Sequence, residues 1–362
     1  MGVSLKLTNL WRVIREVDLQ AIRQAAHTPF ELVIVDEGDG QAVRLRALLS
    51  PDTGAPHPWV RAMPAAQFEI PSNLAPPVAG ILITASIDLS PALQSVLTIL
   101  RRAHVPTVIV MLGADLPAHK LAFQAERRLI VPVLDSQTAL QIGTALIDIT
   151  DADLRLALAR QLPPLRPAVF DLTIDETARA NATYALTSGL AEVVPVLSVP
   201  LNLGDMVVLT KNQLIMSYRL VLAAGRDGEP RKLIGEILSV LGGGLLFRQA
   251  ARQLVGLIPV AGLVPKVAIA YGGTWAIGRA VVAWVTEGRE ITADFVKTMS
   301  VEGVERGRAV AARLVEQMKA TGERANGRWE RLKAHLPLRG RRGASVARAD
   351  DAELVRKRFE RS

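Results

Sequence analysis

The residues with the clearest chemical potential form a short acidic loop that contains two glycines. The apolar run ELVIV at 31–35 leads into this loop, and a helical pattern follows it. A loop in this position can bind phosphate, because its backbone N–H groups and the positive end of the helix dipole point at the same place. Nucleotide-binding phosphate loops read G-x-x-x-x-G-K-[S/T], in which the lysine reaches the phosphates and the hydroxyl binds magnesium.

Residues 36–43, DEGDGQAV, have the length of such a loop but not its chemistry. Asp36 and Gln41 replace the two glycines of the pattern. Ala42 replaces its lysine, and Val43 replaces its hydroxyl residue. The carboxylates at 36, 37 and 39 would also repel a phosphate. We therefore expect no GTPase activity from this degenerate phosphate-loop region, whose candidate residues are Asp36, Gly38, Gly40, Gln41, Ala42 and Val43.

Other catalytic and metal-binding patterns do not occur in the sequence. Its five histidines form no HExxH or comparable ligand spacing, and it contains no GxSxG motif. The lack of cysteine excludes disulfides, thiol nucleophiles and cysteine metal sites. The acids at 36–39 could hold a cation, although acidic loops of this kind are more often simply solvated. We expect no catalytic residue, no metal, no cofactor and no small-molecule substrate.

An α/β sheet must position the acidic loop. Continuous Val, Ile and Leu runs at 30–35, 78–84, 106–112 and 129–134 are typical of buried parallel strands, and a further short strand is expected at 68–70. Helical patterns at 41–49, 91–103, 118–128 and 137–148 alternate with them. This alternation predicts a doubly wound α/β sheet. The proline-rich segment 51–77 is expected to be mostly irregular.

A charge-poor, glycine-rich stretch at 233–286 dominates the second half of the chain. Ala268, Gly272, Ala276 and Ala280 recur every four residues, which places them on one helix face. Small residues there let another helix approach closely. The longest uncharged run, 253–265, has 13 residues, fewer than the ~20 that a membrane-spanning helix needs.

Two interpretations of this stretch stay open. Its proline and glycine breaks favour a re-entrant or interfacial hairpin at a membrane, while close helix packing favours a soluble helical bundle. Either role falls to the same small or helix-breaking residues: Gly242, Gly243, Gly244, Pro259, Gly262, Pro265, Gly272, Gly273, Ala276 and Gly278.

Composition divides the chain into six segments. We expect an amphipathic N-terminal helix at 1–28, an α/β domain at 29–150, a proline-marked linker at 151–169, an apolar helical domain at 170–288, a charged amphipathic helix at 289–337 and a disordered basic tail at 338–362. The net charge is +8, and residues 287–362 hold 18 Lys and Arg against 12 Asp and Glu. This basic end favours an anionic partner.

The α/β layout resembles a small Ras-like GTPase domain of the Era type. The resemblance rests on the strand, loop and helix at 31–49 and covers about 120 residues. The guanine-reading motif Asn-Lys-x-Asp of that family appears here as Leu112-Gly113-Ala114-Asp115, so only Asp115 keeps its residue type. The resemblance implies a degenerate Ras-like sheet, that is, a pseudo-GTPase.

The second half resembles the YcjF-like, GTPase-associated domain of unknown function 697. The matching residues are LTKNQLIMSYRLVLAAGR at 209–226, LGGGLLFRQAARQLVGLIPVAGLVPK at 241–266 and AIAYGGTWAIGRA at 268–280. Members of this family often follow an Era-like GTPase domain, some are membrane proteins, and the family has no established reaction. The combined fold expectation is α/β plus all-α, with an apolar glycine-rich helical domain and a long C-terminal helix.

These observations predict a non-catalytic, membrane-associated scaffold or regulatory protein of pseudo-GTPase type. Alternatives are a soluble adaptor that pairs with a true GTPase or with itself, and a GTP-binding protein with atypical motifs. No apolar signal segment opens the chain, which favours the cytoplasmic side of a membrane or the cytoplasm. Nucleic acid is not favoured, because the basic segment lacks interleaved aromatic residues. The expected anionic-lipid contacts are Arg324, Arg328, Arg331, Lys333, Arg339, Arg341 and Arg342.

Overall fold

A computed structural model describes seven stretches of the chain: 17–50, 57–70, 77–86, 88–113, 127–190, 203–240 and 263–335. Within these, side chains are described except at 188–190, 203–207, 263–266, 293, 296 and 318–335. The chain forms two compact units, Met1–Arg313 and Leu314–Ser362. The boundary between the units lies inside the C-terminal helix.

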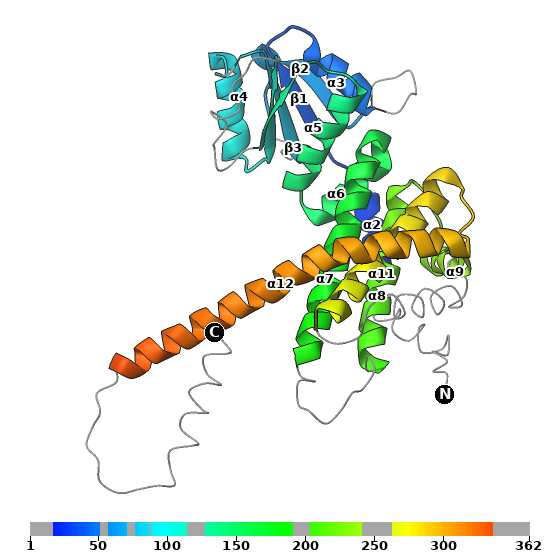
Figure 1. The fold of residues 1–362 in the computed structure, drawn as a ribbon. Coiled ribbons are helices and arrows are strands. Elements are labelled where there is room, and N and C mark those ends of the chain that lie inside the picture. The colour runs from blue at the N-terminus through cyan, green and yellow to red at the C-terminus, as the bar shows by residue number, and fades with distance from the viewer. Residues whose placement is uncertain are drawn as a thin grey trace, which may run out of the picture. The chain divides into compact units, whose positions relative to one another are not determined.

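The first half contains a five-stranded parallel sheet, as the sequence predicts (Figure 1). The strands are β1 (Leu32–Asp36), β2 (Val60–Pro64), β3 (Ala79–Thr84), β4 (Thr107–Leu112) and β5 (Arg127–Val131), in the order β2-β1-β3-β4-β5. Every neighbouring pair is parallel. This order is the one that flavodoxin-like doubly wound sheets have. The coarse α/β prediction is confirmed, and the Ras-like version of it stays a prediction.

One strand lies where the sequence indicated irregular chain. β2 pairs with β1 from Leu32 opposite Val60 to Asp36 opposite Pro64. The expected strand at 68–70 has no strand conformation, and Phe68 instead packs into the core. β2 was missed because its sequence, VRAMP, has one β-branched residue and ends on proline, which only an edge strand tolerates.

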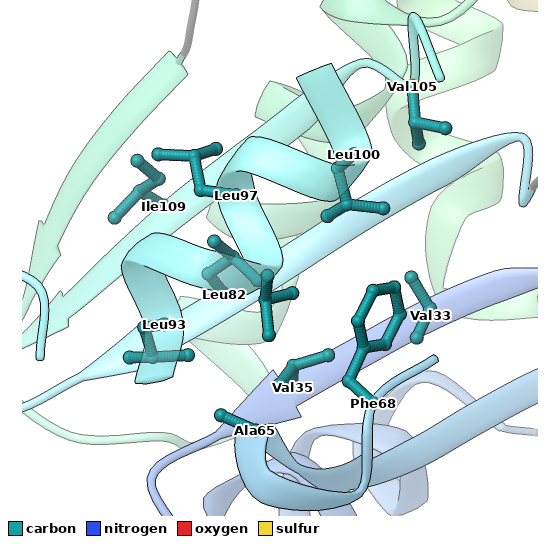
Figure 2. Close-up of a cluster of buried hydrophobic side chains, with 11 residues drawn as sticks. Val33, Val35, Ala65, Phe68, Leu82, Leu93, Leu97, Leu100, Val105 and Ile109 are labelled. Carbon is teal, nitrogen blue, oxygen red and sulfur yellow. The ribbon is translucent and has the colours of Figure 1, made fainter. Parts of the chain in front are cut away.

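Helices cover both faces of the sheet. α3 (Gln41–Leu49) and α5 (Ser136–Ile149) contact one face, and α4 (Pro91–Arg102) contacts the other beside a short 3-10 turn, η1 (Ala65–Gln67). Figure 2 shows the core under α4, where alternate residues of β1, β3 and β4 meet the apolar face of the helix. Its buried members are Val33, Val35, Ala65, Phe68, Leu82, Leu93, Val96, Leu97, Leu100, Val105 and Ile109. The two-sided cover explains why β1 and β3 are buried along their whole length.

The remaining elements are helical. They are α2 (Leu19–Ala26), α6 (Ala152–Gln161), the 3-10 turn η3 (Pro163–Leu165), α7 (Arg166–Leu190), α8 (Leu203–Ala223), α9 (Pro230–Val240), α11 (Leu263–Glu287) and α12 (Ala293–His335). α7 packs against both α8 and α11, and α8 also contacts α11 (Figure 1). This confirms the predicted helical region after the α/β sheet.

The segment 151–169, expected to be a linker that opens with a helix over 151–162, folds into α6, η3 and the first residues of α7. Pro163 and Pro164 start η3 instead of breaking the structure, because a proline at the first positions of a helical turn loses no hydrogen bond. Leu165 is buried against Gly143 of α5, where a Cβ would come within 2.6 Å of the leucine side chain. The segment is therefore a packed joint between α5 and α7.

The N-terminal helix is described from Leu19, after Asp18, whose side chain accepts the N–H of Ala21 at 2.9 Å. This cap marks a helix start inside the range that the sequence predicted as one continuous helix. Residues 1–16 lie outside the described part of the chain.

Candidate functional site

In the loop after β1, backbone N–H groups bind the side-chain carboxylate of Asp36. Asp36 ends β1 and is 2% exposed. One of its oxygens accepts the N–H of Gly38 at 3.0 Å, and the other accepts the N–H of Ala42 at 2.9 Å, at the first turn of α3. Gly38 and Gly40 have positive φ angles of 97° and 83°, which let the backbone fold around the carboxylate. The side chain of Asp36 thus takes up N–H groups of the kind that bind a phosphate in a phosphate loop.

A second carboxylate, that of Asp39, also lies at the N-terminus of α3. Asp39 accepts the N–H of Gln41 at 3.3 Å. Burial raises the pKa of Asp39, the hydrogen bond from Gln41 opposes the rise, and the neighbouring Asp36 adds to it. Ala42, at the position of the missing lysine, is buried, and Val43, at the position of the missing hydroxyl, exposes 49% of its surface as an apolar side chain.

Other polar side chains along the carboxyl edge of the sheet also bind nearby backbone. Thr84, buried at the end of β3, accepts the N–H of Ser86 at 3.1 Å. Asp135 follows β5 and caps α5 by accepting the N–H of Thr138 at 2.8 Å. Ligands of doubly wound sheets bind at this edge, where the strand order reverses between β1 and β3. Asp36, Thr84 and Asp135 each use at least one oxygen to hold the fold.

The guanine-reading candidate Asp115 lies outside the described residues. Gly242, Gly243, Gly244, Pro259 and Gly262 do so as well. Pro265 lies in the first turn of α11, in a part of that helix whose side chains are not described. Of the basic candidates, Arg324, Arg328, Arg331 and Lys333 are positions of α12, and Arg339, Arg341 and Arg342 fall outside the described residues.

The small-residue face of α11 packs against α12. A Cβ on Gly272 would come within 2.6 Å of the Val304 backbone, and one on Gly303 would come within 2.5 Å of the Gly272 carbonyl oxygen. One turn along, a Cβ on Gly307 would come within 2.5 Å of the Ala268 carbonyl oxygen. The backbones of the two helices therefore touch, and any larger side chain at these positions would separate them.

The neighbouring small residues of α11 serve different contacts. Gly278 faces α7, where a Cβ would come within 2.5 Å of the Ile174 side chain, and Ala276 is 5% exposed. Gly273, in contrast, has open space around its Cα. Trp275 lies between two guanidinium groups, with Arg306 of α12 5.0 Å and Arg279 5.7 Å from the ring centroid. The described small-residue face is used for packing within the protein.

A buried polar network joins α7, α8 and α11. Asn181 and Thr274 are fully buried, and the Asn181 side-chain amide donates to the Thr274 hydroxyl at 2.9 Å. Gln213 donates to the same hydroxyl at 3.1 Å, and Asn212 donates to the Asn181 carbonyl at 2.8 Å. The Thr274 hydroxyl itself donates to the backbone oxygen of Ala270 at 2.8 Å. These bonds fix the relative register of three helices.

Two further side-chain contacts join α7 and α11 beside this network. Tyr271 of α11 donates to Asp175 of α7 at 2.7 Å, and burial followed by this hydrogen bond raises the pKa of the tyrosine. Arg279 of α11 donates to Asp171 of α7, also at 2.7 Å. These residues were not predicted from the sequence. The available signal was the presence of hydrogen-bonding side chains within otherwise apolar helical segments.

A groove of about 610 Å³ lies between α2, α6, α7 and α8. Its charged lining includes Arg155, which pairs with Glu176 at 2.9 Å and donates to the backbone oxygens of Ile147 and Thr150. The Arg155 guanidinium is therefore committed to the joint between α5, α6 and α7. Within the described residues, no cluster of His, Asp or Glu side chains has the arrangement of a metal site.

No family model matches the chain, and no curated protein matches it. The two family resemblances therefore remain predictions, and the functional argument rests on the residues themselves.

Proposed function

We propose that the protein is a non-catalytic scaffold or regulatory protein of pseudo-GTPase type that attaches peripherally to the cytoplasmic face of a membrane. One observation carries the non-catalytic part. The Asp36 carboxylate accepts the backbone N–H of Gly38 in the loop and that of Ala42 at the start of α3, and this loop has neither the lysine nor the hydroxyl of a phosphate loop. A bound phosphate would have to displace a buried carboxylate of its own charge sign.

The helical region supports peripheral attachment over insertion. Among the described helices, none combines the length and apolar character needed to cross a bilayer. The apolar faces of α7, α8 and α11 are largely buried against one another, and Asn181 and Thr274 bind each other in their core. Inserting α11 between lipids would break these contacts. The basic positions of α12 would then make the contact with the membrane.

The main alternative is a soluble adaptor that pairs with a true GTPase. It is favoured by exposed apolar residues on the α/β sheet: Val43 on α3, Val133 after β5 and Leu140 on α5 are 49, 45 and 40% exposed. α3 and α5 contact each other, and this alternative requires that the three side chains form one patch, because contiguous apolar patches are what mark protein-binding surfaces. The same residues would serve as the protein-binding platform of a membrane scaffold.

Extraction of membranes from cells that express the full chain tests the proposal. We expect the protein in the membrane pellet and its release by high salt or alkaline carbonate, because charge holds a peripheral protein. Release only by detergent would indicate insertion. Recovery entirely in the soluble fraction would contradict membrane attachment and favour the adaptor.

A further inference from the structure

The last part of α12 is one continuous helix from Leu314 to His335, and it belongs to the second compact unit. Positions on a helix repeat every 3.6 residues, so residues three, four and seven apart share a face. We call this stretch the 314–335 helix. Its sequence distributes apolar, basic and acidic residues to different faces.

Apolar positions form one stripe along the 314–335 helix. Leu314, Met318, Ala325, Trp329 and Leu332 follow one another at spacings of four, seven, four and three residues. A stripe of this width, on a helix of low overall hydrophobicity, is typical of helices that lie in a membrane interface.

Basic positions border the stripe on both sides. Arg324, Arg328 and Arg331 share the face on one side, at spacings of four and three residues. Lys319 and Lys333 fall on the other side.

The acidic positions fall on the face away from the stripe. Glu316, Glu323 and Glu330 are seven residues apart and so share that face. A surface that approached the stripe would therefore meet apolar and basic positions together, and the acidic positions would lie on the opposite face.

This charge pattern decides between possible partners. In a self-associating coiled coil, the positions that flank the apolar seam carry opposite charges that pair between chains. Here the flanking charges are all positive, so two copies would repel each other. A nucleic acid would use the cations but would leave the apolar stripe in water. A surface that is both anionic and apolar beneath its charges matches the stripe and its borders together.

We propose that the 314–335 helix lies in the interface of an anionic membrane, with the apolar stripe toward the acyl chains and the flanking basic residues at the lipid headgroups. This inference rests on the proposed peripheral membrane attachment and assigns it to one face of one helix. It places Arg324, Arg328, Arg331 and Lys333 in a shared role, and it adds Lys319, Trp329 and Leu332 to the contact.

Flotation of the full-length protein with vesicles tests the assignment. Vesicles of phosphatidylcholine alone and vesicles with added phosphatidylserine are compared. We expect binding to the anionic vesicles, weakened by salt. The triple variant Arg324→Ala/Arg328→Ala/Arg331→Ala should bind on the order of 100-fold more weakly, since each basic residue near the surface contributes about fivefold. The double variant Trp329→Ser/Leu332→Ser, which keeps the charge, should lose roughly tenfold or more.

Matched variants on the face away from the stripe provide the control. Ala320→Ser/Ala334→Ser changes two residues of the same helix away from the stripe and should bind as the unchanged protein does. If the unchanged protein binds no vesicle, both the inference and the proposed membrane attachment fail. If it binds and the stripe variant binds equally well, only the inference fails. Loss of a dimer in the stripe variant, with vesicle binding unaltered, would instead assign the stripe to a second copy.

Discussion

Asp36 shows how a buried acid can be stable at the end of a central strand. A carboxylate that leaves water needs hydrogen bonds to replace its hydration. Asp36 obtains them from the N–H groups of Gly38 and Ala42, and the α3 dipole adds a favourable field at the helix N-terminus. Asp36 therefore stabilises this loop. For a phosphate to bind the same N–H groups, the Asp36 side chain would have to move away from them.

Replacing Asp36 should destabilise the protein. In Asp36→Ala, the buried N–H of Ala42 at the α3 N-terminus and the part-buried N–H of Gly38 in the loop lose their acceptor, and an unpaired buried donor costs about 1–3 kcal/mol. The free energy of unfolding, measured by urea denaturation, should fall by this amount. Asp39→Ala in the same loop removes an exposed carboxylate and should change it by less than about 0.5 kcal/mol. Equal effects of the two variants would show that Asp36 has no special part in the loop.

Tyr271 should make the protein sensitive to alkali. Burial, and then the hydrogen bond to Asp175, raise the pKa of Tyr271 above its ordinary value of 10.0. The unfolded chain thus loses this proton first, and the stability that the neutral tyrosine supplies is complete below pH 10.0 and falls as the pH rises further. The expected slope is about 1.4 kcal/mol per pH unit for one such group.

Denaturation curves of Tyr271→Phe between neutral pH and pH 11 measure this contribution. The variant should lose about 1 kcal/mol at neutral pH, because the hydrogen bond to Asp175 disappears, and its stability should fall less steeply above pH 10. Tyr218→Phe is the comparison, since burial raises the pKa of Tyr218 as well, while its hydroxyl has no hydrogen-bond partner among the described residues. Tyr218→Phe should leave the free energy of unfolding at pH 7 unchanged or raise it. An unchanged alkaline slope in Tyr271→Phe would refute the assignment.

At the scale of elements, the contact between α11 and α12 depends on the absence of side chains. Adjacent glycines of α11 differ only in what surrounds them. Gly272 touches the α12 backbone, whereas Gly273 has open space. In a helix, alanine is favoured over glycine by about 1 kcal/mol, so a clash must outweigh this gain to destabilise.

Gly272→Ala should therefore destabilise the protein and Gly273→Ala should stabilise it. Forcing a methyl group between two backbones costs about 1–3 kcal/mol, while the free position gains up to about 1 kcal/mol. The melting temperatures of the two variants should shift in opposite directions. A stabilised Gly272→Ala protein would mean that α12 does not pack on α11 as described.

The polar network predicts a second effect at this scale. Thr274→Val keeps the side-chain shape but leaves the Asn181 and Gln213 amides without their acceptor, at a cost of about 1–3 kcal/mol. Thr286→Val in the same helix changes an exposed hydroxyl that donates to Val282 and serves as the control. Urea denaturation should separate the two variants, and similar midpoints would argue that the network contributes little to stability.

The elements that the sequence predicted best are those with a continuous apolar pattern. β1, β3 and β4 lie close to the expected ranges, because strands that are buried on both faces consist almost entirely of Val, Ile and Leu. β2 escaped because its residues are mixed and its structure comes from a neighbour, the edge of β1. Hydrophobic periodicity carries no signal for such elements.

The candidate site, too, could be predicted from the sequence only in part. The loss of lysine and hydroxyl at Ala42 and Val43 is readable from the sequence. The capture of the loop N–H groups by Asp36 requires the three-dimensional path of the loop, which the positive φ angles of two glycines create. The polar network also required the structure, since Asn181 and Thr274 are 93 residues apart.

At the scale of the molecule, the protein combines a sheet in which the loop after β1 binds the Asp36 carboxylate and a helical region in which described small residues such as Gly272 and Gly278 pack against other helices. In the proposed function, the exposed apolar residues of α3 and α5 would contact a protein partner, and the basic positions of α12 would contact an anionic membrane. This arrangement suits a protein that brings two partners together.

The central claim is that the loop after β1 holds its own carboxylate in place of a nucleotide phosphate. Isothermal titration of the full-length protein with GTP and magnesium tests it most directly, with a true GTPase titrated in the same buffer as the positive control. The account predicts heats equal to those of ligand dilution at every GTP concentration. Saturable binding with a micromolar dissociation constant would contradict it, because the phosphates of GTP would then have displaced the Asp36 carboxylate from the loop N–H groups.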